Sequence, residues 1–297
     1  MKNKNLILGA AVAFTASMMV SCGGDNQEDV TNVVLEDTNQ VVTEPDQPAV
    51  DYAVPTPNEL FEIIKIQGGE QKVGLVNPLD NRSKYVETKT KAINFGIYSA
   101  DLAYMSCFGI GTEFLMYFKA IEEMGTELGI EGAFDEELMG RIENNEGDTD
   151  SLFAISNETY YDSYLYLEEN DKGVELCLIM AGGYIESLYI VCNLVDKYKE
   201  GDPIIEKIGD QKLVLENLLD FILQYSDDQS VSEVMDDLIS LSEVFETSME
   251  FEESGTSIDK GENNMLVLSG GGSYKMTKTA LEKITAKVEE LRANYTK

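Results

Sequence analysis

Two acidic residues stand inside otherwise apolar stretches, and they offer the most specific chemistry in the sequence. Asp101 and Glu186 occupy roughly corresponding places in two similar segments, 96–102 and 182–188, which match at glycine, tyrosine and leucine. A buried carboxylate is costly unless it is hydrogen-bonded or paired with a cation. Tyrosines flank both acids: Tyr98, Tyr104, Tyr184 and Tyr189. The pattern predicts either a polar pocket for a cation or small polar ligand, or a structural network in which hydroxyls and helix ends satisfy the acids. The structural network is the simpler interpretation.

Most other catalytic arrangements are excluded by composition. The chain contains no histidine, which removes Ser-His-Asp and Cys-His catalysis and the usual zinc and haem ligand. The acidic loop around Gly147 fails as a calcium loop, because Ile142 would occupy its first ligand position. The glycine-rich run 269–275 lacks the spacing of a phosphate-binding loop and is expected to be a flexible connection between helices. We therefore expect no metal and no cofactor, and a non-enzymatic role is favoured over a carboxylate-based hydrolase or lyase.

The first residues have the layout of an export signal. Lys2 and Lys4 precede an apolar run of residues 6–14, which is too short to cross a bilayer. The sequence Met18-Met19-Val20-Ser21-Cys22 follows, and it resembles the bacterial lipobox. The resemblance implies cleavage after residue 21 and attachment of lipid to Cys22. Several acyl chains would then hold the protein stably at a membrane.

The remaining cysteines are expected to be reduced. Cys107, Cys177 and Cys192 are left after lipidation, and an odd number cannot pair completely within one chain. Cys177 and Cys192 would lie roughly 22 Å apart on a single helix, which is too far for a disulfide. The sequence therefore predicts buried thiols, with a bridge from Cys107 left open as an alternative.

Charge and composition limit the partners. The chain has 22 Lys and Arg against 55 Asp and Glu, a formal net charge of −33, which opposes binding to nucleic acid. Residues 23 to about 57 contain eight acids, no basic residue and four prolines. Such a composition favours an extended, disordered tether. We therefore divide the chain into a signal peptide (1–21), a tether (22–57) and a folded domain (58–297).

The folded domain is expected to be all-α, a multi-helix bundle. Apolar periodicity predicts helices near 58–64, 83–108, 112–128, 134–145, 149–169, 174–198, 203–225, from 230 onward, and 281–291. The stretch 174–198 is apolar on nearly every side, which predicts a central core helix. Ser230 and Glu233 have the spacing of a capping box. The basic last segment, 275–297, is expected to pack on the acidic body.

The two similar segments also indicate an internal duplication, with two similar helical halves about a pseudo-twofold axis.

Ser21 before Cys22, and acids such as Asp25 soon after it, resemble surface-exported lipoproteins of Bacteroidota. Residues 90–200 resemble uncharacterised helical lipoproteins of that group. These resemblances imply an outer-membrane lipoprotein that faces the periplasm or the cell surface. The leading hypothesis is a binding or scaffold module for an envelope protein partner, and the alternative is a small-ligand or cation carrier.

Overall fold

The computed structural model describes residues 56–67, 71–72, 74–108, 111–134, 137–145, 147–252, 257–260, 266–269 and 273–297. The signal peptide, Cys22 and the tether up to residue 55 lie outside these residues. Their assignments, and the domain boundary at residue 58, therefore stay predictions.

The predicted all-α fold is confirmed. The α-helices are α1 (Pro57–Gln67), α2 (Thr88–Ser106), α3 (Gly111–Leu128), α4 (Leu138–Asn144), α5 (Thr149–Glu169), α6 (Gly173–Leu194), α7 (Pro203–Leu223), α8 (Gln229–Ser248) and α9 (Lys278–Tyr295). Short 3₁₀ helices span Leu79–Lys84 and Glu131–Ala133. The single helix expected from about residue 83 is thus a 3₁₀ turn followed by α2.

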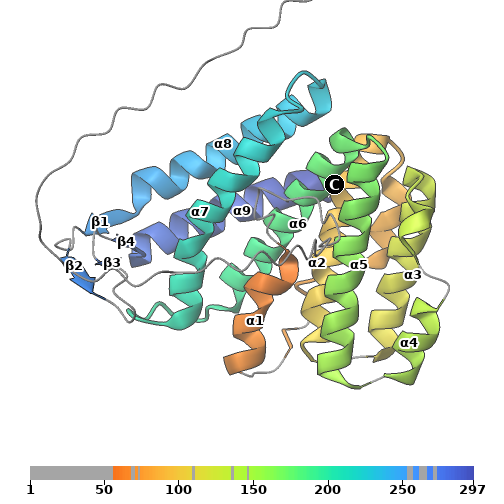
Figure 1. Ribbon diagram of the computed structural model, residues 1–297, viewed down its shortest axis with the longest axis horizontal. Helices are drawn as coiled ribbons and strands as arrows, with labels where there is room; N and C mark the ends of the chain where they lie inside the picture. Colours follow the sequence, from red (N-terminus) through yellow and green to blue (C-terminus); the bar gives the residue numbers. More distant parts are fainter. Residues whose placement is uncertain are drawn as a thin grey trace, which may run out of the picture. The chain divides into compact units, whose positions relative to one another are not determined.

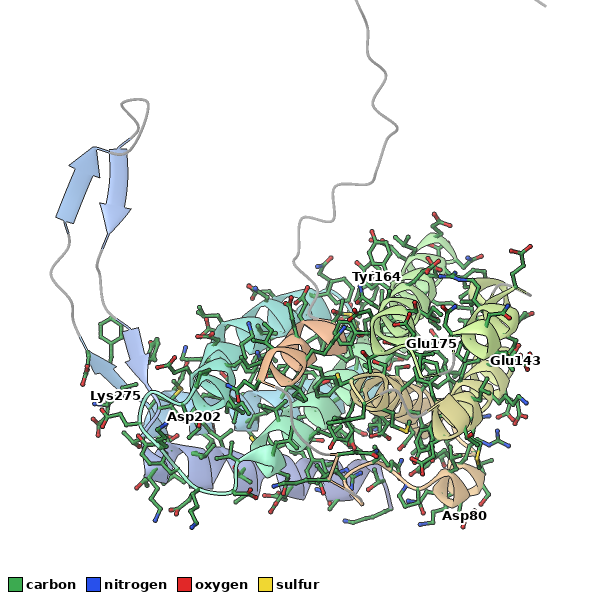
Figure 2. All side chains as sticks on the ribbon, turned by 90° about the horizontal axis from the view of Figure 1, so that it is seen from below. Asp80, Glu143, Tyr164, Glu175, Asp202 and Lys275 are labelled. Atoms are coloured by element: carbon green, nitrogen blue, oxygen red, sulfur yellow. The ribbon has the colours of Figure 1, made fainter. Side chains whose placement is uncertain are left out.

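Helices α2 and α6 pack against each other along their length and form the centre of the molecule. Helices α3 and α5 contact α2, whereas α7, α8 and α9 contact α6 (Figure 1). Small residues of α2 allow the close approach, since Gly96 lies against the backbone of α6 and Ala100 and Ala103 are buried. Side chains fill the spaces between the helices, and acids such as Asp80 and Glu143 lie at the outer surface (Figure 2).

Helix α6 is the core helix that the sequence predicts. Among the described residues it is the one helix long and apolar enough to cross a membrane, but 83% of its apolar window is buried inside the fold. Its apolar side chains therefore already have protein neighbours. Cys177 and Cys192 lie on this helix as free thiols, and Cys107 at the end of α2 is also free.

The caps of the later helices explain where each begins. Asp202 accepts a hydrogen bond from the backbone N–H of Ile204 ahead of Pro203, as the sequence predicts. The predicted start of α8 at Ser230 is wrong. Asp228 is the N-cap, because its carboxylate accepts from the N–H groups of Ser230 and Val231.

The described residues between α8 and α9 form short strands. Strand β1 (Glu250–Glu252) pairs antiparallel with β4 (Ser273–Lys275), and β2 (Ser257–Lys260) pairs with β3 (Leu266–Ser269). The sequence predicts only a flexible connection over residues 269–275. That prediction is wrong for Ser269 and for 273–275, which pair as strands, whereas the glycines at 270–272 lie outside the described residues. Helix α9 begins after Thr277, whose hydroxyl caps the N–H of Ala280.

Candidate functional site

The crossing of α2 and α6 brings Asp101 and Glu186 together. Both side chains are 0% exposed, and their carboxyl groups are within hydrogen-bonding reach of each other. The sequence predicts that both acids could line one polar pocket, because they occupy roughly corresponding places in two similar segments. The structure places them at one point in the core, and their role in ligand binding stays a prediction.

A third charged residue, Arg292 of α9, completes this cluster, and sequence reasoning missed it. Its Nε donates to Glu186 Oε2 at 2.8 Å and its Nη2 donates to Glu186 Oε1 at 2.9 Å. The guanidinium also lies over the ring of Tyr189, 4.3 Å from the ring centroid. A two-point pair of this kind is the strongest geometry available to a carboxylate. The basic character of α9 was a signal that a cation from this helix reaches the acidic body.

A segment without α-helix or strand, residues 74–86, covers the cluster, and we call it the strap. Side chains from the core bind its backbone. The N–H of Asn77 donates to Asp101 Oδ2 at 3.0 Å, and Arg292 Nη2 donates to the carbonyl of Leu75 at 3.1 Å. Tyr117 donates to the carbonyl of Asn77 at 2.8 Å. The strap is therefore held by the residues that it covers.

Asn77 is the most completely bound residue of the strap. It is 0% exposed, its amide donates to Tyr85 Oη at 3.0 Å and to Asn94 Oδ1 at 3.3 Å, and its amide oxygen accepts from Asn81 at 2.8 Å. A small polar ligand bound in a closed pocket would make contacts of this kind. In this structure the chain's own asparagine occupies the polar centre.

Of the four tyrosines that flank the two acids in the sequence, Tyr98, Tyr104 and Tyr189 lie at the cluster or beside the strap, and Tyr184 does not. Tyr98 donates to the carbonyl of Pro78 in the strap at 3.0 Å. Tyr104 accepts from the N–H of Lys72 at 3.0 Å, just before the strap, and Tyr189 lies under Arg292. Tyr184 is not part of the cluster, because its hydroxyl donates to the carbonyl of Gln211 on α7 at 3.0 Å.

Burial dominates the electrostatics of the cluster. It raises the pKa of Asp101 well above the ordinary value, and the neighbouring charge of Glu186 raises it further. Burial also raises the pKa of Glu186, although the hydrogen bonds and charge of Arg292 oppose that change. Burial alone would lower the pKa of Arg292, but Glu186 raises it, so the guanidinium stays charged. The tyrosine pKa values are raised mainly by burial, so the phenols stay neutral.

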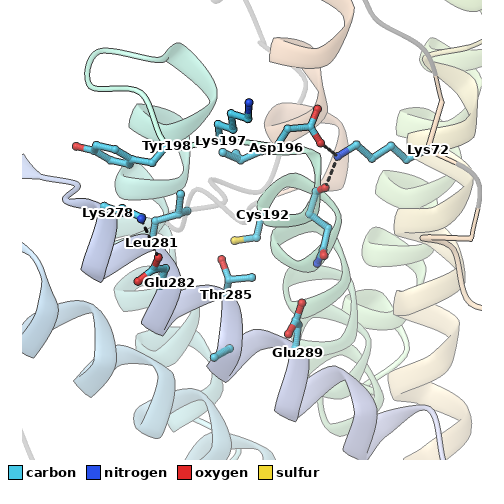
Figure 3. Close-up of a pocket in the computed structure, with 13 residues that line it drawn as sticks. Lys72, Cys192, Asp196, Lys197, Tyr198, Lys278, Leu281, Glu282, Thr285 and Glu289 are labelled. Atoms are coloured by element: carbon cyan, nitrogen blue, oxygen red, sulfur yellow. Dashed lines mark hydrogen bonds and ion pairs between the residues drawn. The ribbon is translucent and has the colours of Figure 1, made fainter.

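An open groove lies between the C-terminal end of α6, the segment 195–198 and α9 (Figure 3). Its volume is about 690 Å³. Cys192, Val195, Leu281 and Ala286 give it an apolar lining, and Thr285 also lines it. Its rim carries Lys and acid pairs: Lys72 Nζ lies 2.7 Å from Asp196 Oδ1, and Lys278 Nζ lies 3.6 Å from Glu282 Oε1.

The described residues contain no group of three or more His, Cys, Asp or Glu side chains that could hold a metal ion.

No protein-family model, curated protein or solved structure matches the chain. The resemblance to helical lipoproteins of Bacteroidota therefore stays a proposal. The groove and the buried cluster are the two features on which a function can be argued.

Proposed function

We propose that the protein is a lipid-anchored binding module of the outer envelope, and that the groove between α6 and α9 receives a polypeptide segment of an envelope protein. The lipobox-like sequence ending at Cys22 and the acidic tether support the location. A module held at a membrane on a long tether can meet a partner without a catalytic site of its own.

The groove is the single observation that carries this proposal. It combines an apolar lining around Leu281 with charged pairs of both signs at the rim. A peptide offers the matching combination of apolar side chains and backbone or side-chain polar groups. Lys197 and Asp196 are exposed at its edge, where a partner can replace the water around them. Surface ion pairs such as Lys278–Glu282 contribute little to folding, so they can be rearranged on binding.

The buried cluster supports a catalytic role less well. Asp101 and Glu186 are both fully buried, and a substrate would first have to displace the strap. The second candidate is a small-ligand or cation carrier, in which the ligand would supply the partner of Asp101 Oδ1, an atom that has no hydrogen-bond donor among the described residues. A carrier predicts that added Ca²⁺ or Mg²⁺ raises the melting temperature of the wild type and not that of Asp101→Asn. The absence of any shift would count against it.

The location is tested by fractionation with a labelled fatty acid. The wild type is expected in the outer-membrane fraction carrying label, and Cys22→Ala is expected to lose both. Protease treatment of intact cells then distinguishes the surface from the periplasmic face. Membrane retention of the unlabelled Cys22→Ala protein would contradict the anchor.

The groove is tested by photo-crosslinking in intact cells. A photoreactive residue at Lys197 or Glu282 is expected to trap a partner, whereas the same residue at the exposed position Glu143 on α4 is not. Charge reversal by Lys278→Glu is expected to weaken the crosslink at Lys197. Equal trapping from Glu143, or none from the groove positions, would overturn the assignment of the groove.

A further inference from the structure

The hydrogen bonding of the buried cluster is incomplete if both acids are ionised. Asp101 Oδ2 accepts from Asn77, but Oδ1 has no donor among the described residues. An ionised carboxylate can only accept hydrogen bonds, so two ionised carboxylates in contact cannot satisfy each other. A fully buried oxygen without a donor is strongly disfavoured.

Among the residues that the structure describes, the positive charge of the cluster is that of Arg292, and it is already paired with Glu186. Both oxygens of Glu186 accept from Arg292, which identifies Glu186 as the ionised member of the pair. The titratable groups that face Asp101 are Glu186, Arg292 and neutral phenols: Tyr85 of the strap, Tyr98 of α2, Tyr117 of α3 and Tyr189 of α6. A second ionised carboxylate would therefore leave an uncompensated negative charge at a site with no contact with water.

We infer that Asp101 carries a proton on Oδ1 and donates it to Glu186, so that one proton and one guanidinium together hold both carboxyl groups and the strap. The proton gives Oδ1 its missing hydrogen bond. It also makes the cluster electrically neutral overall. Asp101 Oδ2 remains an acceptor for Asn77, which couples the strap to this arrangement.

A proton fits this position better than a bound cation. Calcium takes six to eight oxygen ligands, and magnesium takes six in a regular octahedron. Two oxygens of Glu186 are occupied by Arg292, and the Tyr98 and Tyr117 hydroxyls donate to backbone carbonyls of the strap. Too few oxygens remain for such an ion.

The pH dependence of stability tests the assignment. In the unfolded chain Asp101 titrates near its ordinary pKa, about 3.9, whereas in the folded chain its pKa is raised. Unfolding therefore releases a proton between those values, and the stability contributed by Asp101 falls as pH rises through that window. Asp101→Asn places an amide N–H where the proton lies and cannot titrate. Relative to this variant, the folding equilibrium constant of the wild type should fall by up to tenfold per pH unit above about pH 4.

Urea unfolding of the full chain followed by circular dichroism, from acidic to neutral pH, measures this difference. Glu186→Gln is the comparison variant, because it removes the anion from Arg292 and should be destabilised at every pH. A wild-type to Asp101→Asn difference that does not change with pH would overturn the inference. So would an Asp101→Asn chain as unstable as Glu186→Gln at neutral pH.

An independent measurement on the wild type covers the case in which a variant does not fold. Infrared spectra of protein labelled with ¹³C in its aspartate carboxyl groups should show a protonated carboxyl band at neutral pH that shifts with the label. The absence of a label-sensitive band at that pH would overturn the assignment.

Hydrogen exchange tests the coupling of the strap. Asp101→Leu removes the acceptor of the Asn77 N–H without adding a charge, so amides in residues 74–86 should exchange faster than in the wild type. Asp101→Asn keeps an acceptor and should protect them, and α4 should be unchanged in both. Unchanged protection of the strap in Asp101→Leu would show that Asp101 does not hold it.

Discussion

Gly96 of α2 and Gly182 of α6 lie against the backbone of each other's helix at equivalent places. A Cβ at Gly96 would clash with the carbonyl of Ile179, and one at Gly182 would clash with the carbonyl of Ile93. Each isoleucine precedes the glycine of its own helix by three residues. The crossing therefore has local twofold symmetry, as the similarity of the two segments predicts. Whether the whole chain consists of two similar halves stays a prediction.

Alanine at either glycine should separate the two central helices. We expect Gly96→Ala and Gly182→Ala each to lower the free energy of unfolding by about 3 kcal/mol, because the added methyl group meets rigid backbone. Gly140→Ala in α4 is the control, since nothing lies within 4 Å of its Cβ position. That change should stabilise the protein slightly through helix propensity. Chemical denaturation measures all three, and equal effects at Gly96 and Gly140 would contradict the close crossing.

Removal of the Arg292 guanidinium should leave Glu186 buried without a counter-charge. We expect Arg292→Met to lower the free energy of unfolding by about 3–5 kcal/mol. Lys287→Met is a matched control on the same helix. Lys287 is 19% exposed against 16% for Arg292, but its partner Glu290 is 61% exposed and lies 3.3 Å away. Its loss should change stability by less than about 1 kcal/mol. Similar melting curves for the two variants would argue against a structural role for Arg292.

The start of α8 can be tested at its cap. Asp228→Ala should destabilise the protein by about 1 kcal/mol, because the N–H groups of Ser230 and Val231 lose their acceptor. Ser230→Ala, the position that the sequence favours, should have an effect below about 0.5 kcal/mol. Thermal unfolding of both proteins decides between the two caps. The reverse order of effects would restore the capping box at Ser230.

The thiols provide a test of lipidation and burial together. Burial raises the pKa of Cys107, Cys177 and Cys192 each to about 12, so few thiolates exist at mildly alkaline pH. We expect little reaction of the folded protein with a thiol reagent, and rapid reaction of three thiols after unfolding in urea. Membrane-derived wild type and Cys22→Ala should give the same count. A fourth reactive thiol in the unfolded wild type would show that Cys22 carries no lipid.

Features fixed by local patterns could be predicted from the sequence. The helical periodicity, the Asp202-Pro203 cap and the apolar α6 each depend on neighbouring residues. The pairing of Asp101 with Glu186 was also accessible, because a buried acid needs a partner and two such acids followed matching glycines.

Features that depend on distant parts of the chain could not be predicted. Arg292 stands 106 residues beyond Glu186, and nothing in its local spacing distinguishes it from the exposed basic residues of α9. The strap is equally hidden, since Asn77 is a polar residue in an irregular segment, and its burial depends on hydrogen bonds from α2 and α3. Tyr184 shows the opposite limit. Tyr184 matches Tyr98 in the similar segments, so the sequence groups the two tyrosines. In the structure, Tyr184 lies on the face of α6 that contacts α7.

The position of Arg292 on α9 orders the assembly of the molecule in time. A ribosome synthesises Asp101 and Glu186 well before the guanidinium that neutralises them. A chain that has emerged only as far as α8 therefore lacks the counter-charge of Glu186, so burial of that carboxylate is unfavourable until α9 arrives. We therefore expect the interior around Glu186 to be completed late in synthesis, once α9 supplies its guanidinium.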